Sequence, residues 1–356
     1  MKKFLVINPF GIGDVLFTTP VIKAIKNSYP GSFIGYWCNE RVKPILKDNP
    51  CIDKIFALSR GDIKRIYHQS RWQGITKFLS LLRNIKREHF DISLDFSLDH
   101  RYGLTSKLLG IKKRLGYNYK KRGRFLTDKI DIAGYQDKHV VEYYLELLKL
   151  LDINPQDEKP ELYITEQDKK RAFDLLQSKG IDNKDLVIGI APGAGESWGK
   201  DARLKHWPAE KFARLADRLI SELGAKILIL GDKTERAIAD TIKNTMRNKP
   251  IDLAGETNLE ELIAIINNLH ILVTNDGGPL HIAVALNKKT VSLFGPVDPK
   301  VYGPYPFNER LHIVLRRTLD CSPCYRNFRL SRCRSNRECL EKIDVDEVFN
   351  AVVNLL

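Results

Sequence analysis

The sequence has no apolar run long enough to cross a membrane. No stretch approaches the roughly 18 uncharged apolar residues that a spanning helix needs. A secretory signal is also missing, because Met1–Lys3 is followed only by the short apolar run Phe4–Ile7 before Asn8, whereas a signal core takes about 7 to 15 apolar residues. We therefore expect a cytoplasmic chain that associates at most peripherally with the cytoplasmic face of the inner membrane.

Acidic residues are scarce in one half of the chain only. Residues 1–150 hold 28 Lys and Arg against 14 Asp and Glu, whereas residues 151–356 hold 30 against 30, so the whole net charge of +14 belongs to the first half. A one-sided positive field favours an anionic partner for that half: nucleic acid, an anionic membrane surface or a phosphorylated saccharide. A basic face that is merely solvated remains the alternative.

The length of 356 residues predicts two domains. Short apolar runs alternate with helical patterns, which is typical of βαβ units and parallel sheets. In the first half we expect strands at 4–8, 33–38, 54–58, 91–96 and 114–117, and helices at 15–28, 72–87, 100–109 and 139–151. The polar segment Asn154–Pro160 is the candidate linker, giving domains 1–160 and 161–356.

The second half repeats the alternation. We expect strands at 186–191, 226–230, 251–253, 271–274 and 290–294, and helices at 208–223, 233–246, 258–268 and 278–287. The fold class is therefore α/β, with two Rossmann-like domains whose parallel sheets face a central cleft. The docking of the last amphipathic stretch, Val345–Leu356, stays open.

Two glycines and a carboxylate follow the first predicted strand. Gly11 and Gly13 permit a tight turn and close approach of a substrate, and Asp14 comes where a helix begins. Asp is also a favoured helix N-cap, which is the structural alternative for Asp14. A third glycine of the dinucleotide fingerprint is missing, so a nicotinamide cofactor is disfavoured.

Two strand ends of the second half have the composition of phosphate-binding turns. Ala191–Gly195 presents small residues, with Lys205 further along the same loop. It is not a Gly-x-x-x-x-Gly-Lys-Ser/Thr loop, which argues against an NTPase of that class. In Val273–His281, amides at a helix start could hold a diphosphate, and Asp276 would face sugar hydroxyls unless it merely caps the helix.

Five motifs in this order resemble glycosyltransferase family 9, the heptosyltransferases that transfer heptose from ADP-heptose to the inner core of lipopolysaccharide. The resemblance covers nearly the whole chain. Its motifs are Gly13–Leu16 with Thr19-Pro20, Pro192–Ala194, Lys205–Pro208, Asp276–His281, and Phe294–Pro296 with Asp298-Pro299.

The resemblance implies an inverting glycosyltransferase of the two-Rossmann-domain (GT-B) type. Asp14 matches the proposed catalytic base, and Lys205 matches the lysine that contacts the donor phosphates. Both are assigned as catalytic residues. The residues assigned to donor binding are Gly193, Ala194, Lys205, Glu235, Asp276, Gly277, Gly278 and His281. Many members have Ser or Thr where Gly277 stands, so one hydroxyl contact to phosphate is missing here.

The basic half is assigned to an anionic, lipid-linked saccharide acceptor. The acceptor-binding residues that we expect are Gly13, Arg60, Lys64, Lys121, Arg122 and Arg124. A nucleic-acid-binding protein would explain the charge but would need aromatic residues interleaved with it, so we expect no nucleic acid. A non-transferring sugar-nucleotide enzyme, such as an epimerase, is the second rival, because fold does not settle reaction.

Four of the six cysteines gather near the carboxyl end, in the pattern Cys321-x2-Cys324-x8-Cys333-x5-Cys339. In a reducing compartment this spacing favours structural zinc over disulfides, with unliganded thiols as the alternative. A catalytic metal is not expected, because the loops predicted to line the cleft contain no Asp-x-Asp motif.

Overall fold

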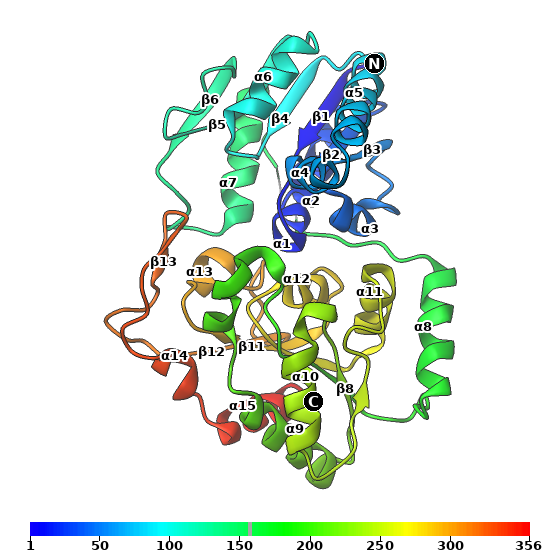
Figure 1. Cartoon of the computed structure of the whole chain (residues 1–356), viewed down its shortest axis with the longest axis vertical. Helices are drawn as coiled ribbons and strands as arrows, with labels where there is room; N and C mark the ends of the chain where they lie inside the picture. The colour runs from blue at the N-terminus through cyan, green and yellow to red at the C-terminus, as the bar shows by residue number, and fades with distance from the viewer. Residues whose placement is uncertain (156–158) are drawn as a thin grey trace. The chain divides into compact units, whose positions relative to one another are not determined.

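A computed structural model describes residues 1–155 and 159–356, without the side chains of Arg60, Glu196 and Ser197. It divides the chain into two compact units, Met1–Tyr163 and Ile164–Leu356 (Figure 1). Part of the predicted linker, 156–158, lies outside the described residues.

The first unit is built on a six-stranded parallel sheet in the order β3-β2-β1-β4-β5-β6. Its strands are β1 (Lys3–Ile7), β2 (Phe33–Cys38), β3 (Lys54–Ala57), β4 (Ile92–Asp95), β5 (Lys113–Tyr119) and β6 (Asp128–Ile132). Its helices are α1 (Ile12–Leu16), α2 (Thr19–Ser28), η1 (Glu40–Val42), α3 (Lys43–Leu46), α4 (Arg60–Gln69), α5 (Arg71–Arg87), α6 (His100–Leu108), α7 (Val140–Glu146) and η2 (Leu147–Leu151).

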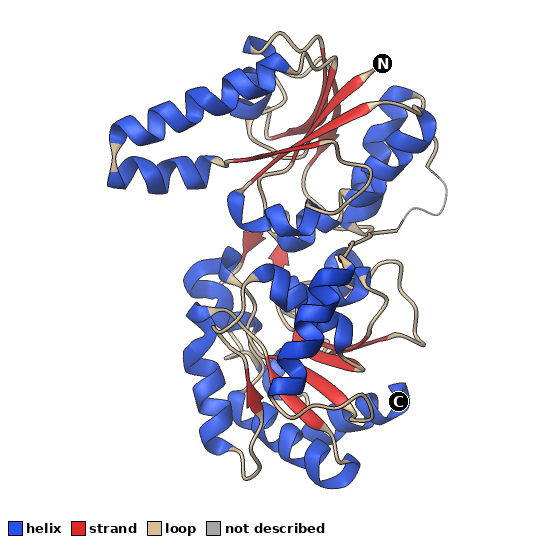
Figure 2. Cartoon of the chain, turned by 90° about the vertical axis from the view of Figure 1, so that its right-hand side faces the viewer, coloured by secondary structure: helices blue, strands red, loops and turns tan. Residues whose placement is uncertain are grey.

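Side-chain alternation along the strands builds a core on both faces of this sheet. Leu5 and Ile7 of β1 pack in one cluster with Ile85 of α5. Phe4 and Val6, which point to the opposite face, are also fully buried. Helices accordingly cover both faces of the sheet (Figure 2).

The second unit repeats the topology, with a parallel sheet in the order β12-β11-β10-β7-β8-β9. Its strands are β7 (Val187–Ala191), β8 (Lys226–Ile229), β9 (Ile251–Asp252), β10 (Ile271–Asn275), β11 (Lys289–Phe294) and β12 (His312–Arg316), and a separate pair is β13 (Tyr325–Arg326) and β14 (Arg329–Leu330). Its helices are α8 (Glu166–Ser178), η3 (Glu196–Lys205), α9 (Ala209–Leu223), η4 (Lys233–Glu235), α10 (Arg236–Thr245), α11 (Leu259–Asn268), α12 (Gly278–Ala285), α13 (Pro299–Tyr302), α14 (Glu338–Glu341) and α15 (Val345–Leu355).

The last helix, α15, belongs to the core of the second unit. Its buried residues Val348 and Val352 lie in the same cluster as Phe212 of α9 and Ile271 of β10. The chain end, whose docking the sequence left open, therefore covers one face of this sheet.

In both sheets the strand order reverses direction once, between β1 and β4 and between β7 and β10. Ligands of open α/β sheets bind outside the carboxyl ends of the strands at such a reversal. The topology therefore marks one candidate site in each unit.

Most predicted elements are present, and the differences have local causes. The edge strands β6 and β12 and the helices α4 and α8 were not predicted. In β6, for example, Asp128, Lys129 and Asp131 alternate with isoleucines, as suits a half-exposed edge strand. The helix predicted over 15–28 is two helices, because Thr18 interrupts it and its hydroxyl donates to Val15 O at 2.6 Å.

Among the described residues, no helix combines the length and the apolar character needed to cross a bilayer.

Candidate functional site

In the first unit, Asp14 lies in the first turn of α1, directly after β1. The helix N-cap is Gly11, and no side chain caps it, so capping does not account for Asp14. The turn is shaped by the buried Asn8, whose amide donates to Asp14 O at 2.9 Å and whose Oδ1 accepts from Phe10 N at 3.1 Å. Asp14 therefore sits at the strand-order reversal on a turn that a buried amide holds in place.

A small pocket of about 10 Å³ opens on the other side of this reversal, at the carboxyl end of β4. Asp95, His100, Tyr117 and Arg122 are among its lining residues. Burial raises the pKa of Asp95 to about 7, although hydrogen bonds from Ser97 oppose the shift. Arg122, which its charge alone predicted to bind the acceptor, thus lines the same pocket as the buried carboxyl group of Asp95. Nothing in the sequence had pointed to Asp95.

The other predicted acceptor residues of the first unit lie outside this pocket. Lys121 and Arg124 are exposed in the loop that follows β5, and Lys64 is exposed on α4. Gly13 lies on α1 beside Asp14. Arg60 begins α4, and its side chain lies outside the described residues.

In the second unit, Lys205 and Asp276 form a buried ion pair. Lys205 Nζ lies 2.7 Å from Asp276 Oδ2, and the two side chains are 7% and 6% exposed. The same ammonium group lies over the ring of Trp198, 4.5 Å from its centroid. The N-cap of α12 is Gly277 rather than Asp276. The Asp276 carboxylate therefore pairs with Lys205 and does not cap the helix.

Asn275, at the end of β10, joins the loops around this pair. Its Nδ2 donates to Pro192 O at 2.6 Å, and its Oδ1 accepts from Trp207 N at 3.1 Å. One buried amide therefore connects the glycine loop after β7 to the segment that carries Lys205. Asn275 had no role assigned from the sequence, although a polar residue that ends an apolar strand is a usable signal for such a contact.

Glu235 closes the glycine loop from the other side. Its Oε1 accepts from Gly195 N at 3.0 Å, and burial raises its pKa. A Cβ placed on Gly193 would come within 1.7 Å of the same Oε1, so any larger residue there would displace the Glu235 carboxylate. The structure thus brings Gly193, Ala194 and Glu235 together, as predicted for one pocket.

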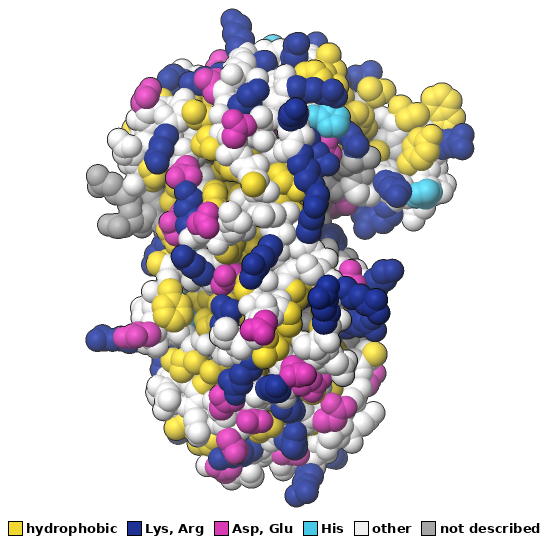
Figure 3. All heavy atoms as spheres, turned by 90° about the vertical axis from the view of Figure 1, so that its left-hand side faces the viewer, with side chains coloured by type: hydrophobic (Ala, Val, Ile, Leu, Met, Phe, Trp, Pro, Cys, Tyr) yellow, Lys and Arg dark blue, Asp and Glu magenta, His cyan; other side chains and the backbone are white. Residues whose placement is uncertain are grey.

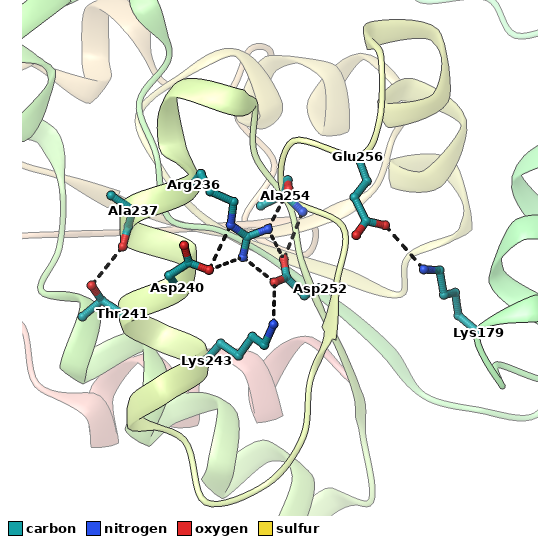
Figure 4. Close-up of polar contacts among 9 residues, drawn as sticks. All are labelled: Lys179, Arg236, Ala237, Asp240, Thr241, Lys243, Asp252, Ala254 and Glu256. Atoms are coloured by element: carbon teal, nitrogen blue, oxygen red, sulfur yellow. Dashed lines mark hydrogen bonds and ion pairs between the residues drawn. The ribbon is translucent and has the colours of Figure 1, made fainter.

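The position of Glu235 is supported by its neighbour Arg236. The Arg236 guanidinium group bonds both carboxylate oxygens of Asp252 and donates to Ala254 O at 2.8 Å, as Figure 4 shows. It also donates to Asp240 Oδ1 at 3.0 Å. This network ties the start of α10 to β9, which fixes the turn that presents Glu235.

The remaining residues assigned to donor binding, Gly277, Gly278 and His281, lie at the start of α12. A Cβ on Gly277 would lie 3.4 Å from Ala194 Cα, which is ordinary van der Waals contact, so the serine of other members would fit there. Gly278 is the first helical residue, and His281 is buried one turn later. Burial lowers the pKa of His281 to about 4, so the imidazole is neutral at pH 7.

The four carboxyl-terminal cysteines are free thiols. Burial, and then the proximity of Cys324, Cys333 and Cys321, raise the pKa of Cys339 to about 11. Within the described part of the chain, no three His, Cys, Asp or Glu side chains are arranged to hold a metal ion. The structural zinc site of Cys321, Cys324, Cys333 and Cys339 therefore stays a prediction.

We predict that Lys205→Ala lowers the free energy of unfolding by about 3 kcal/mol, because Asp276 would stay buried without its counter-ion. Adding Asp276→Asn should recover part of this loss. Urea unfolding of both single variants and the double variant measures the coupling, and strictly additive losses would contradict it.

We predict that the contribution of Asp95 to stability falls as pH rises from 3.8, the ordinary pKa of Asp, to about 7, its value at Asp95. His281 contributes with the opposite sign, because burial lowers its pKa to about 4. In this window the unfolded chain has lost a proton at Asp95 that the folded chain keeps, at a cost of at most about 1.4 kcal/mol per pH unit. Removing this group in Asp95→Asn should make the slope of stability against pH more positive than in the wild type, whereas Asp128→Asn, on the edge strand β6, should leave the slope unchanged. Urea unfolding across this pH range tests the difference, and an unchanged slope in Asp95→Asn would refute it.

Comparison with known proteins agrees with this architecture. The chain is 27% identical to lipopolysaccharide heptosyltransferase 3 of Escherichia coli (strain K12) over 300 residues, which is 83% of each chain. The crystal structure of a family 9 glycosyltransferase from Veillonella parvula superposes with a TM-score of 0.83 at 24% identity, covering 99% of this chain and 97% of that one. The structure of E. coli heptosyltransferase WaaC with ADP-2-deoxy-2-fluoro heptose superposes with a TM-score of 0.70 at 16% identity. The match covers 99% of this chain and 100% of that one.

These structures share the fold, so the predicted α/β class with two Rossmann-like domains of the GT-B type is confirmed. The model of glycosyltransferase family 9 (heptosyltransferase) matches residues 78–333, well over half of the chain. The chain therefore belongs to glycosyltransferase family 9, and it is a glycosyltransferase of the heptosyltransferase kind.

Proposed function

We propose that this enzyme transfers a heptose from ADP-heptose to an anionic, lipid-linked saccharide such as a lipopolysaccharide core, at the cytoplasmic face of the inner membrane. The observation that carries the proposal is the gathering of Lys205, Asp276 and Glu235 around the glycine loop of the second unit. The curated relative acts on lipopolysaccharide by its name, and WaaC was solved with an ADP-heptose analogue.

The donor diphosphate is assigned to Lys205 and to the backbone amides at the start of α12. An ammonium group and a helix N-terminus both favour anions, and the same groups would stabilise charge that grows on the departing diphosphate. In the free protein Asp276 neutralises Lys205 at 2.7 Å. Donor binding would then redirect the lysine from the carboxylate to phosphate and leave Asp276 to accept hydroxyl groups of the sugar or ribose.

Glu235 and His281 are assigned supporting roles in the donor pocket. Glu235 holds Gly195 N at 3.0 Å and so fixes the loop whose amides face the nucleotide. His281, neutral at pH 7 because burial lowers its pKa to about 4, would offer hydrogen bonds without adding charge.

Asp14 is assigned as the general base that takes the proton from the attacking acceptor hydroxyl. Direct displacement at the anomeric carbon then inverts its configuration. Such proton transfer contributes about 10²- to 10⁴-fold to the rate. No catalytic metal is proposed, because Lys205 and the helix amides supply the positive charge that a metal would otherwise bring to the leaving group.

We predict that Asp14→Asn abolishes turnover and leaves donor binding intact, because asparagine keeps the size of the side chain but cannot accept the proton. Transfer is measured as ADP released in the presence of acceptor, and ADP-heptose affinity by calorimetry. Retention of more than about a tenth of the wild-type rate would contradict the role of Asp14 as base. Donor consumed without acceptor would instead favour the rival, a non-transferring sugar-nucleotide enzyme.

We predict that replacing Lys121, Arg122 and Arg124 together by Ala raises the acceptor KM and spares donor affinity. Added salt should imitate the substitutions, because exposed charges are screened over roughly 8 Å at physiological ionic strength. Replacing Lys200, an exposed lysine of the second unit, by Ala is the control. An unchanged KM for a phosphorylated acceptor would show that these cations only keep the protein soluble.

A further inference from the structure

Helices α4 and α5 form a hairpin that projects from the first unit (Figure 2) and exposes apolar side chains. On α5, Trp72 is 78% exposed, Ile75 43% and Leu79 44%. Residues three and four apart share one face of a helix, so these three side chains form a single stripe. Tyr67 of α4 is 43% exposed as well.

This stripe is separate from the one that anchors α5 in the core. Leu81 and Ile85 are buried in the cluster beneath the helix, and Phe78 packs against them. At 100° per residue, the centre of the exposed stripe lies roughly a quarter turn or more from that anchoring face. Folding of the first unit therefore does not explain why Trp72, Ile75 and Leu79 are apolar.

The hairpin is also strongly basic. Residues 60–87 contain a single acidic residue, Asp62, which is buried and caps α4. The segment contains eight basic residues: Arg60, Lys64, Arg65, Arg71, Lys77, Arg83, Lys86 and Arg87. The space-filling view shows hydrophobic side chains next to Lys and Arg on the projecting part of this unit (Figure 3).

Close packing makes the hairpin a rigid support for this surface. A Cβ on Gly74 would lie 3.2 Å from Tyr67 Cα, so the helices approach closely at this point. The Arg71 guanidinium carbon lies over the Tyr67 ring at 5.8 Å from its centroid. The exposed stripe is therefore presented by two packed helices and not by a loop.

We propose that the α4–α5 hairpin docks this enzyme on an anionic membrane surface. Trp72, Ile75 and Leu79 enter the boundary between lipid headgroups and acyl chains, where tryptophan is favoured, while the surrounding Lys and Arg bind lipid phosphates. Each such cation contributes about 1 kcal/mol near an anionic surface. The docking rests on the proposed function, in which the acceptor is lipid-linked.

The hairpin is tied to the turn that carries the proposed base. Asp62 at the start of α4 accepts from Glu40 N at 3.1 Å, and the adjacent Asn39 donates to Pro9 O at 3.1 Å in the turn before Asp14. A membrane-bound hairpin would therefore keep the acceptor end of the first sheet near the lipid. A lipid-linked hydroxyl could reach Asp14 without leaving the bilayer surface.

A protein partner is the alternative occupant of the stripe. The ratio of eight cations to one buried carboxylate favours lipid. Phosphates on a membrane are dense, so the basic side chains can bind them without matching the fixed positions of acidic residues on a protein partner. Binding that is indifferent to lipid charge would contradict this choice.

The test is cosedimentation of the full chain with vesicles of phosphatidylcholine containing about one third phosphatidylglycerol, and with vesicles of phosphatidylcholine alone. The wild type should bind the anionic vesicles only. Ile75→Glu should lower the bound fraction about tenfold. Val353→Glu on α15 is the matched control, because Val353 is 42% exposed and Ile75 43%. Absence of wild-type binding, or equal loss in the two variants, would overturn the proposal.

Tryptophan fluorescence gives a second readout of the same contact. Trp37 and Trp207 are buried and Trp198 is half-buried, so Trp72 is the one that lipid can newly cover. A blue shift on anionic vesicles should disappear in Trp72→Phe while most of the binding remains. A blue shift that persists in Trp72→Phe would count against the docking face.

Two acceptors separate failure of docking from failure of the proposed function. Ile75→Glu should transfer normally to an acceptor stripped of its acyl chains and slowly to the same acceptor in vesicles. Transfer to the stripped acceptor tests the proposed function, whereas vesicle binding tests the docking. Equal rates of Ile75→Glu and wild type on vesicle-bound acceptor would refute a role for the hairpin.

Discussion

The reversal of strand order in each parallel sheet is the constraint on which the rest of this structure depends. Because all strands of a sheet run the same way, their carboxyl ends share one edge, and the connections part to opposite faces only where the order reverses. Asp14 and Asp95 flank this point in the first unit, and the loops of Lys205 and Asp276 flank it in the second. The candidate functional residues therefore lie at the strand-order reversals, where no connecting helix crosses the carboxyl ends of the strands.

Buried amides and ion pairs then hold these loops in place. Asn8 shapes the turn of Asp14, and Asn275 joins the glycine loop to the segment of Lys205. A buried polar side chain is costly unless its hydrogen bonds are made, so each of these amides admits few loop conformations. The backbone of the proposed donor site is thereby held in place by hydrogen bonds within the protein.

The two units divide the charge as they divide the proposed work. The first unit, Met1–Tyr163, holds 29 Lys and Arg against 18 Asp and Glu, whereas the second unit, Ile164–Leu356, holds 29 against 26. A unit with a small net charge that buries its Lys205–Asp276 pair can select a nucleotide by geometry. A basic unit with an exposed apolar stripe suits a long, anionic and partly lipidic molecule.

The sequence alone determined the fold class and most strands, and it singled out the residues that we assign to the donor pocket. Apolar periodicity is a local property, and the glycine turns with Asp14, Lys205 and Asp276 occur in recognisable order. The apolar pattern of the sequence did not reveal strands β6 and β12, because edge strands are half-exposed and need not be continuously apolar. Only tertiary structure decided that Asp276 pairs with Lys205 instead of capping α12, and that Asp95 is buried beside Arg122. The pairing depends on which distant segments come into contact, and the burial depends on how much water these contacts exclude. A local sequence pattern specifies neither.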